Sequence, residues 1–336
     1  MKHAKKTRPF LGLSGAPLPN SIAEVRYIRL GGLDQWVMIR GENLDNPPMI
    51  LLHGGPGFSE TPFFRRYNAP LEKGLTVVYW DQRGAGKSAD PKITKSAMTV
   101  ERFVADLDEL VGAVCARVGQ PKVVISGHSW GSVLGPLYAT RFPEKVAAYV
   151  GCGQIGDWQS GVMASYKWAL EQAQRIGSTQ ALKELRTIGL PPHTAIDLWK
   201  ERIGLQRFAG QKKVKALWTM LRTLFGAPES SVFDVFHFPS ILRALRFSLD
   251  AMWAEVSVLK LQALAPELQM PVYFFLGRND RWVPPEVSVA YVDMLTAPSK
   301  NLVWFEDSGH EPFVDEPAKF NRLMLDLVRS TVAVLA

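Results

Sequence analysis

The 336-residue sequence predicts an α/β fold, in which a mostly parallel central sheet is flanked by helices and carries an inserted helical cap. Short apolar runs typical of buried strands alternate with helix-like segments through the first half of the chain. Further strand-like runs follow near the C-terminus, after a long stretch with helical patterning. With 47% hydrophobic residues, the chain can bury a large core, either as one domain with an insertion or as two tightly joined units.

The strands are expected in two groups on either side of the insertion. The strand-like segments are residues 24–30, 35–40, 49–52, 75–80, 122–126, 146–151, 272–276 and 301–305. We therefore expect residues 1–153 and 265–336 to form the core, and residues 154–264 to form a helical cap that contacts the substrate.

Helices are expected to cover the sheet and to build the cap. Apolar residues recur at helical spacing over residues 99–118, with Thr99 suited to the N-cap position. Asp106 and Asp108 are expected on a solvated face of this helix. Helix candidates in the insertion, separated by proline-containing breaks, are residues 181–188, 194–203 and 212–224.

The segment Gly127-His128-Ser129-Trp130-Gly131 follows a strand-like run and precedes a helix-compatible stretch. A serine on a sharp strand-to-helix turn is held exposed above the sheet, and the flanking glycines let the backbone turn without clashes. Glycine and serine are common, so the bare pattern also arises by chance. The strand and helix around it favour Ser129 as a nucleophile, whereas the role of His128, which could line the pocket, stays open.

A serine hydroxyl is a weak nucleophile and requires a base and an orienting acid. Asp280 and His310 each follow a predicted strand, which gives the chain order serine, acid, histidine. Asp307 is the rival acid, but a partner on a separate strand more easily reaches the ring nitrogen that faces away from Ser129. Taken singly, Asp280 is equally typical of a turn and His310 of a surface histidine. Their joint occurrence favours a triad.

An oxyanion site is expected beside Ser129. The glycine-rich segment His53-Gly54-Gly55-Pro56-Gly57 follows a predicted buried strand and can aim a backbone N–H at a developing oxyanion. We expect Gly55 to supply one donor and Trp130 to supply the second. His53 is expected to make structural hydrogen bonds beneath this turn.

Together these motifs resemble the α/β-hydrolases of the proline iminopeptidase-like branch. The resemblance spans nearly the whole chain and is carried by residues 53–57, 81–88 and 127–131, with Asp280 and His310. It implies an α/β-hydrolase fold and a serine hydrolase that acts through an acyl-enzyme. Such enzymes release N-terminal residues, often proline, from short peptides or aminoacyl amides, or cleave esters and amides.

One departure concerns recognition of a free amine. Family aminopeptidases tend to carry an Arg-Ile-Glu stretch late in the cap, whose acidic residue helps to bind the substrate's α-amine, and this stretch is missing here. Asp250 and Glu255 are possible substitutes, although each is also typical of a solvated helix charge. A carboxylesterase or lactonase acting on small hydrophobic esters is therefore the first alternative. A noncatalytic protein that binds a small ligand is the alternative from another class.

Aromatic residues are concentrated in the predicted cap, where most are expected to form its core. A minority can line an apolar pocket, and the candidate substrate-binding residues are Trp158, Trp253 and Glu255. The expected substrate is a small molecule or short peptide with a hydrophobic group.

Composition argues against other partners. The net charge of +7 is scattered and accompanies no recognisable nucleic-acid-binding module. No apolar run approaches the ~20 residues of a spanning helix, so we expect neither nucleic-acid nor membrane binding, and a cytoplasmic location. Cys115 and Cys152 are expected to be buried free thiols, with a single disulfide as the alternative. Metal-ligand spacings are missing, and neither a metal nor another cofactor is expected.

Residues 86–88 end like a phosphate-binding loop, but Asp81 stands where that pattern needs glycine. We therefore interpret Asp81 and Arg83 as a buried structural pair under the active site.

Overall fold

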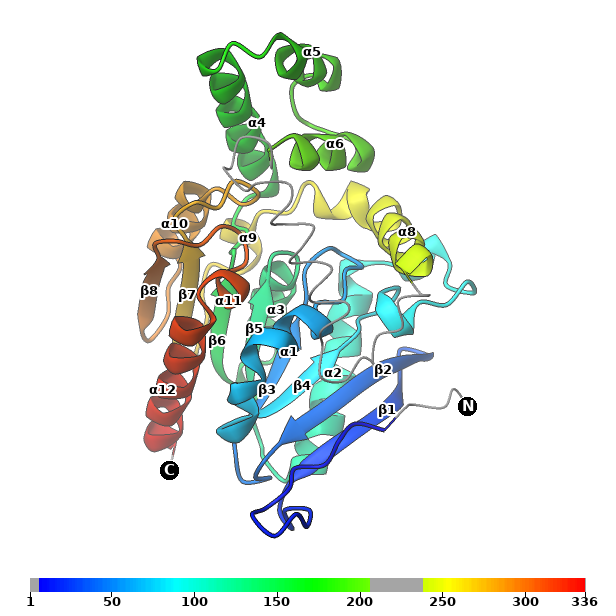
Figure 1. The fold of residues 1–336 in the computed structure, drawn as a ribbon, viewed down its shortest axis with the longest axis vertical. Coiled ribbons are helices and arrows are strands. Elements are labelled where there is room, and N and C mark those ends of the chain that lie inside the picture. Colours follow the sequence, from blue (N-terminus) through cyan, green and yellow to red (C-terminus); the bar gives the residue numbers. More distant parts are fainter. Residues whose placement is uncertain (1–5, 206–237, 336) are drawn as a thin grey trace.

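The computed structural model describes residues 6–205 and 238–335. Its centre is an eight-stranded sheet with the order β1-β2-β4-β3-β5-β6-β7-β8 (Figure 1). The strands are β1 (Ile22–Leu30), β2 (Leu33–Gly41), β3 (Pro48–Leu52), β4 (Thr76–Trp80), β5 (Val123–His128), β6 (Val146–Cys152), β7 (Val272–Gly277) and β8 (Lys300–Phe305). β2 is antiparallel to both of its neighbours, and the remaining pairs are parallel. The predicted mostly parallel α/β fold is confirmed.

Alternating side chains divide the interior into two cores, one on each face of the sheet. In β3, Ile50 and Leu52 belong to one core, whereas Met49 and Leu51 belong to the other. The helices that contribute to the first core include α2 (Val100–Val118), α3 (Gly131–Arg141) and α10 (Pro285–Met294). Those that contribute to the second are α1 (Thr61–Asn68), α11 (Pro312–Asp315) and α12 (Pro317–Leu335).

Helix α2 begins where the sequence predicts. The Thr99 hydroxyl oxygen accepts a hydrogen bond from the backbone N–H of Arg102 at 3.2 Å, and thereby caps the helix. Asp108 forms a partly exposed ion pair with Lys145, as expected of a surface carboxylate. For Asp106, however, the prediction of a solvated face is wrong, because this carboxylate is fully buried.

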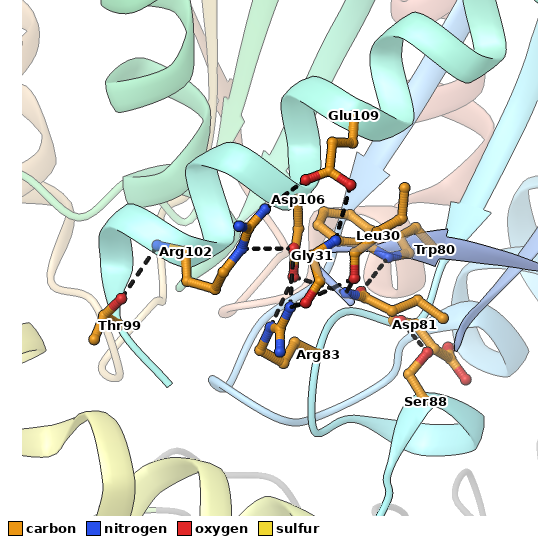
Figure 2. Close-up of polar contacts among 11 residues, drawn as sticks. Leu30, Gly31, Trp80, Asp81, Arg83, Ser88, Thr99, Arg102, Asp106 and Glu109 are labelled. Atoms are coloured by element: carbon orange, nitrogen blue, oxygen red, sulfur yellow. Dashed lines mark hydrogen bonds and ion pairs between the residues drawn. The ribbon is translucent and has the colours of Figure 1, made fainter. Parts of the chain in front are cut away.

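Two arginines compensate the charge of the buried Asp106 carboxylate (Figure 2). The Arg83 guanidinium reaches both of its carboxylate oxygens, at 2.8 and 3.0 Å, and Arg102 Nε lies 2.9 Å from Oδ1. Arg102 also bonds Glu109, whose second oxygen accepts the Gly31 N–H. This network joins α2 to the turn between β1 and β2 and to the loop after β4.

The predicted pairing of Asp81 with Arg83 is also wrong, although both residues are buried. Asp81 instead accepts hydrogen bonds from the Ser59 hydroxyl and from the backbone N–H of Lys87. Its own backbone carbonyl accepts from Ser88 Oγ. Asp81 therefore organises its own loop, while Arg83 reaches across to α2.

Helices between β6 and β7 gather at one end of the sheet (Figure 1). They are α4 (Trp158–Arg175), α5 (Thr179–Ile188), α6 (Ala195–Leu205), α8 (Phe238–Val256) and α9 (Leu261–Leu264). The predictions at 181–188 and 194–203 correspond to α5 and α6, and the candidate at 212–224 lies outside the described residues. The core and cap boundaries stay a prediction.

The described helices include none with the length and apolarity needed to span a membrane. Cys115 and Cys152 are both free, as predicted, but only Cys152 is buried, and the expected burial of Cys115 is wrong because this residue is partly exposed on α2.

Candidate active site

Ser129 lies on the turn between β5 and α3. Its φ of +52° makes it the one non-glycine residue in the left-handed region among those the structure describes. Its N–H donates to the Cys152 carbonyl at 3.0 Å, and its carbonyl accepts from Ser132 Oγ at 2.6 Å. These bonds hold the serine in a conformation that such residues rarely adopt.

The two glycines of the motif are needed for close approach rather than for a left-handed backbone. A Cβ on Gly131 would lie 2.0 Å from the Leu52 carbonyl oxygen, and one on Gly127 would lie 2.3 Å from the Gly131 carbonyl oxygen. Strand β3, the turn and the start of α3 therefore pack backbone against backbone, which fixes the position of Ser129.

Asp280 and His310 are brought together by the loops after β7 and β8. His310 Nδ1 lies 2.8 Å from Asp280 Oδ2, and the other Asp280 oxygen accepts the N–H groups of Trp282 and Val283 at 2.8 and 2.9 Å. The Trp282 ring stacks on the His310 ring at 5.5 Å. His310 is thus oriented through Nδ1, which leaves Nε2 as the ring nitrogen for proton transfer.

The rival acid, Asp307, is exposed, and its backbone N–H bonds Glu316. The carboxylate bonded to His310 is that of Asp280.

The glycine-rich turn after β3 runs beside the serine. A Cβ on Gly54 would lie 3.3 Å from Ser129 Cβ, and Gly55 lines the same cavity as Ser129. Within the described residues, the N–H groups of Gly55 and Trp130 donate no hydrogen bond, so both stay available to an oxyanion.

His53 makes structural hydrogen bonds beneath this turn, as predicted. Its Nδ1 donates to the Gly54 carbonyl at 2.8 Å, and its Nε2 accepts the Gln82 N–H at 3.1 Å. A ring with one donating and one accepting nitrogen is neutral. Burial lowers the pKa of His53, which also favours the neutral ring.

A cavity of about 180 Å³ lies between the core loops and the cap helices. Ser129 and His310 line it from the core. The cap contributes mainly apolar side chains, among them Trp158, Val162, Leu198, Leu245 and Leu249. The site can therefore hold an apolar group next to the serine.

The three candidate substrate-binding residues differ in position. Trp158 lines the cavity. Trp253 does not line the cavity but packs edge to face against Trp158, with ring centroids 5.8 Å apart. Its Nε1–H donates to the His193 carbonyl. Glu255 does not line the cavity, because its carboxylate accepts the Val100 N–H at 2.9 Å at the start of α2. Asp250 is exposed on α8 and also does not line the cavity.

Four charged residues that the sequence reasoning did not single out also line the cavity: Glu60, Asp157, Arg202 and Glu311. For Glu60 and Glu311, the one signal in the sequence that could have identified them is their position relative to the motifs. Glu311 directly follows His310, and Glu60 stands shortly after the glycine-rich turn. Arg202 lies on α6, and its sequence context is that of an ordinary charged residue on a helix.

Comparison with known proteins agrees with this architecture. Residues 47–317 match the family described as alpha/beta hydrolase fold. The chain is 31% identical to the probable aminopeptidase YbaC of Bacillus subtilis (strain 168) over 311 residues, which cover 90% of this chain and 96% of that protein. It is 25% identical to a proline iminopeptidase of Lactobacillus delbrueckii subsp. bulgaricus over 319 residues, with the same coverage of 90% and 96%.

A solved structure, the proline iminopeptidase of Mycobacterium smegmatis, superimposes with a TM-score of 0.62 at 19% identity and covers 93% of this chain and all of that one. This likeness supports the fold. With the sequence matches, it confirms the resemblance on which the fold prediction relied, and the chain belongs to the alpha/beta hydrolase fold family.

Proposed function

We propose that this protein is a serine hydrolase that acts through an acyl-enzyme and releases N-terminal residues from short peptides or aminoacyl amides. One observation carries the proposal: Ser129, on its left-handed turn, lines the same cavity as a histidine bonded to a buried carboxylate. The aminopeptidase names of its relatives support the reaction class.

The geometry supports a two-step reaction. Ser129 Oγ attacks a carbonyl carbon as its proton passes to His310 Nε2, and Asp280 stabilises the resulting imidazolium. The N–H groups of Gly55 and Trp130 hold the oxyanion. His310 then gives its proton to the leaving amine, and water hydrolyses the acyl-enzyme with His310 again as the base.

A carboxylate in the cavity supports a substrate with a free amine. A protonated amine in a dry cavity requires a compensating anion. The sequence offered Asp250 and Glu255 for this role, but neither lines the cavity, whereas Glu311, which directly follows His310, does.

The second candidate is a carboxylesterase or lactonase. The largely apolar roof, with Leu198, Leu245 and Leu249, supports this alternative because it can bind a hydrophobic ester that has no amine.

A substrate panel separates the two candidates. The proposal predicts hydrolysis of prolyl and other aminoacyl arylamides, with kcat/KM lower by roughly 10- to 100-fold when the amine is acetylated, because a charged hydrogen bond worth about 1.5–3 kcal/mol is lost. Glu311→Gln should raise KM for the free-amine substrates and leave hydrolysis of aryl esters unchanged. Equal or faster turnover of N-acetylated substrates and esters would identify an esterase instead.

A further inference from the structure

His128, the residue before Ser129, has a buried side chain held from both sides. Its Nδ1 lies 2.6 Å from Glu60 Oε1, and its Nε2 lies 2.9 Å from the backbone carbonyl oxygen of His310. The same Glu60 oxygen also accepts the Gly54 N–H at 2.9 Å. His128 and Glu60 thus connect the glycine-rich turn, the nucleophile turn and the loop that carries the base.

The two partners of His128 determine its protonation state. A carbonyl oxygen and an ionised carboxylate can accept hydrogen bonds but cannot donate them. Both ring nitrogens of His128 must therefore donate, which requires a doubly protonated imidazolium. His53, also buried and close by, is neutral because one of its nitrogens accepts an N–H.

The charges around His128 favour the same state. Burial alone would lower its pKa, but the charge and hydrogen bond of Glu60, the charge of Glu311 and the hydrogen bond to His310 together raise it to about 9. The other ionisable groups facing it are the imidazoles of His53 and, with ring centroids 4.6 Å apart, His310. Near neutral pH, Glu60 and His128 are therefore an ion pair.

The structure offers Glu60 little other compensation. Its side chain is buried, and within the described residues its Oε2 has no hydrogen-bond partner. Removing one member of a buried ion pair leaves the other uncompensated, whereas removing both is much better tolerated. The pair should therefore behave as a unit.

We propose that Glu60 and His128 are positioning residues, an ion pair that locks the oxyanion turn and the His310 backbone onto the nucleophile turn while His128 carries both ring protons. Within the described residues, the hydrogen bonds of the pair go to backbone groups of Gly54 and His310 and not to Ser129 Oγ or the His310 ring, so the pair acts through the placement of Gly55, Ser129 and His310. The inference rests on the proposed acyl-enzyme function. Raising the pH through the pKa of His128 removes the proton that bonds one partner, so activity falls.

The test is the pH dependence of kcat and kcat/KM from pH 6 to 10.5, for the wild type, Glu60→Gln, His128→Gln and the double variant. Wild-type activity should fall near pH 9. Glu60→Gln should lower kcat roughly tenfold with little change in KM, and should move the alkaline limb at least one pH unit lower. His128→Gln should lower kcat similarly and remove that limb, and the double variant should be no worse than either single variant.

Glu72→Gln is the matched control. Like Glu60, Glu72 is a buried carboxylate in an ion pair, but its partners are Arg40 and Arg65 and it does not line the cavity. This variant should lose stability and keep the alkaline limb of the wild type. If Glu60→Gln and His128→Gln also keep that limb, or lower activity equally at every pH without moving it, the ion pair does not position the site.

Measurements on the wild type cover the case in which a variant fails to fold. In ¹⁵N-histidine NMR spectra at pH 7.5, one buried histidine should have both nitrogens protonated and should titrate near pH 9. Absence of such a histidine overturns the inference. Ser129→Ala separates failure of the proposed function from failure of the ion-pair inference. Turnover that survives in Ser129→Ala overturns the proposed function. If Ser129→Ala loses turnover but Glu60→Gln keeps the alkaline limb of the wild type, only the ion-pair inference is overturned.

Discussion

Ser129 has an unfavourable backbone conformation that its surroundings maintain. Left-handed φ at a non-glycine residue costs of order 1–3 kcal/mol and persists only where neighbouring structure enforces it. Here the Cys152 carbonyl and the Ser132 hydroxyl bond the serine backbone, while Gly131 packs directly against β3. The turn therefore presents the hydroxyl to the cavity without relying on side-chain flexibility.

The choice of acid can be tested with two matched substitutions. Asp280→Asn should lower kcat by about 10³- to 10⁴-fold, because the amide no longer favours the His310 tautomer that accepts the serine proton. Asp307→Asn, in the exposed rival acid, should leave kcat within about twofold of the wild type, as expected for a surface change. The measurement is steady-state kinetics on the best arylamide, and the reverse ranking would overturn the assignment.

Local sequence signals explain which site residues could be predicted. Ser129, Asp280 and His310 each follow a strand whose apolar run is visible in the sequence, so their common edge of the sheet follows from the parallel order. The positions of Glu60 and Glu255 depend on partners far away in the chain, His128 and Val100. A single sequence carries no signal for those pairings.

At the scale of elements, helix α2 is attached to the sheet by both apolar and ionic contacts. Its apolar face packs in the first core, and Asp106 pairs with Arg83 at the edge of that face (Figure 2). Helical periodicity predicted the apolar face correctly. It could not reveal that an arginine from the loop after β4 reaches Asp106, so the sequence predicted a solvated carboxylate.

Asp106 and Asp108 provide a paired test of this network. Asp106→Asn should lower the free energy of unfolding by about 3–5 kcal/mol, because it leaves the buried Arg83 guanidinium uncompensated. Asp108→Asn should change it by less than about 1 kcal/mol, because its ion pair with Lys145 is partly exposed. Chemical denaturation of the three proteins measures both values. Similar losses in the two variants would contradict the buried network.

The strands were the most predictable elements because burial on both faces produces continuous apolar runs. Cap helices were harder to delimit. Helices α4 and α8 each mix core-facing, cavity-facing and exposed positions, so α4 includes Trp158 in the cavity as well as exposed residues such as Gln159. Neither helix was delimited from the sequence, although helical character in the insertion was apparent.

At the scale of the whole molecule, the helices between β6 and β7 gather at one end of the sheet (Figure 1), and they line the cavity together with the loops of the sheet. The loops supply the proposed reacting groups and the cap supplies most of the apolar wall. Bond cleavage and substrate choice are thus expected to depend on different parts of the chain.

Two tryptophans of α4 test this division. Trp158→Ala should raise KM selectively for substrates with bulky hydrophobic side chains, because Trp158 lines the cavity. Trp168→Ala removes the same side chain from the half-buried face that contacts Arg281, away from the cavity, and should leave selectivity unchanged. The ratio of kcat/KM values for bulky and small aminoacyl arylamides measures the effect. An unchanged ratio in Trp158→Ala would assign selectivity to another part of the site.

The central claim, that Ser129 is the nucleophile of a hydrolase, is tested most directly by fluorophosphonate labelling combined with turnover. The folded wild-type protein should be labelled on Ser129, as located by peptide mass spectrometry, and Ser129→Ala should lose both labelling and hydrolysis of the substrate panel. Hydrolysis retained by Ser129→Ala, or a wild-type protein that neither labels nor hydrolyses any substrate, would contradict the account.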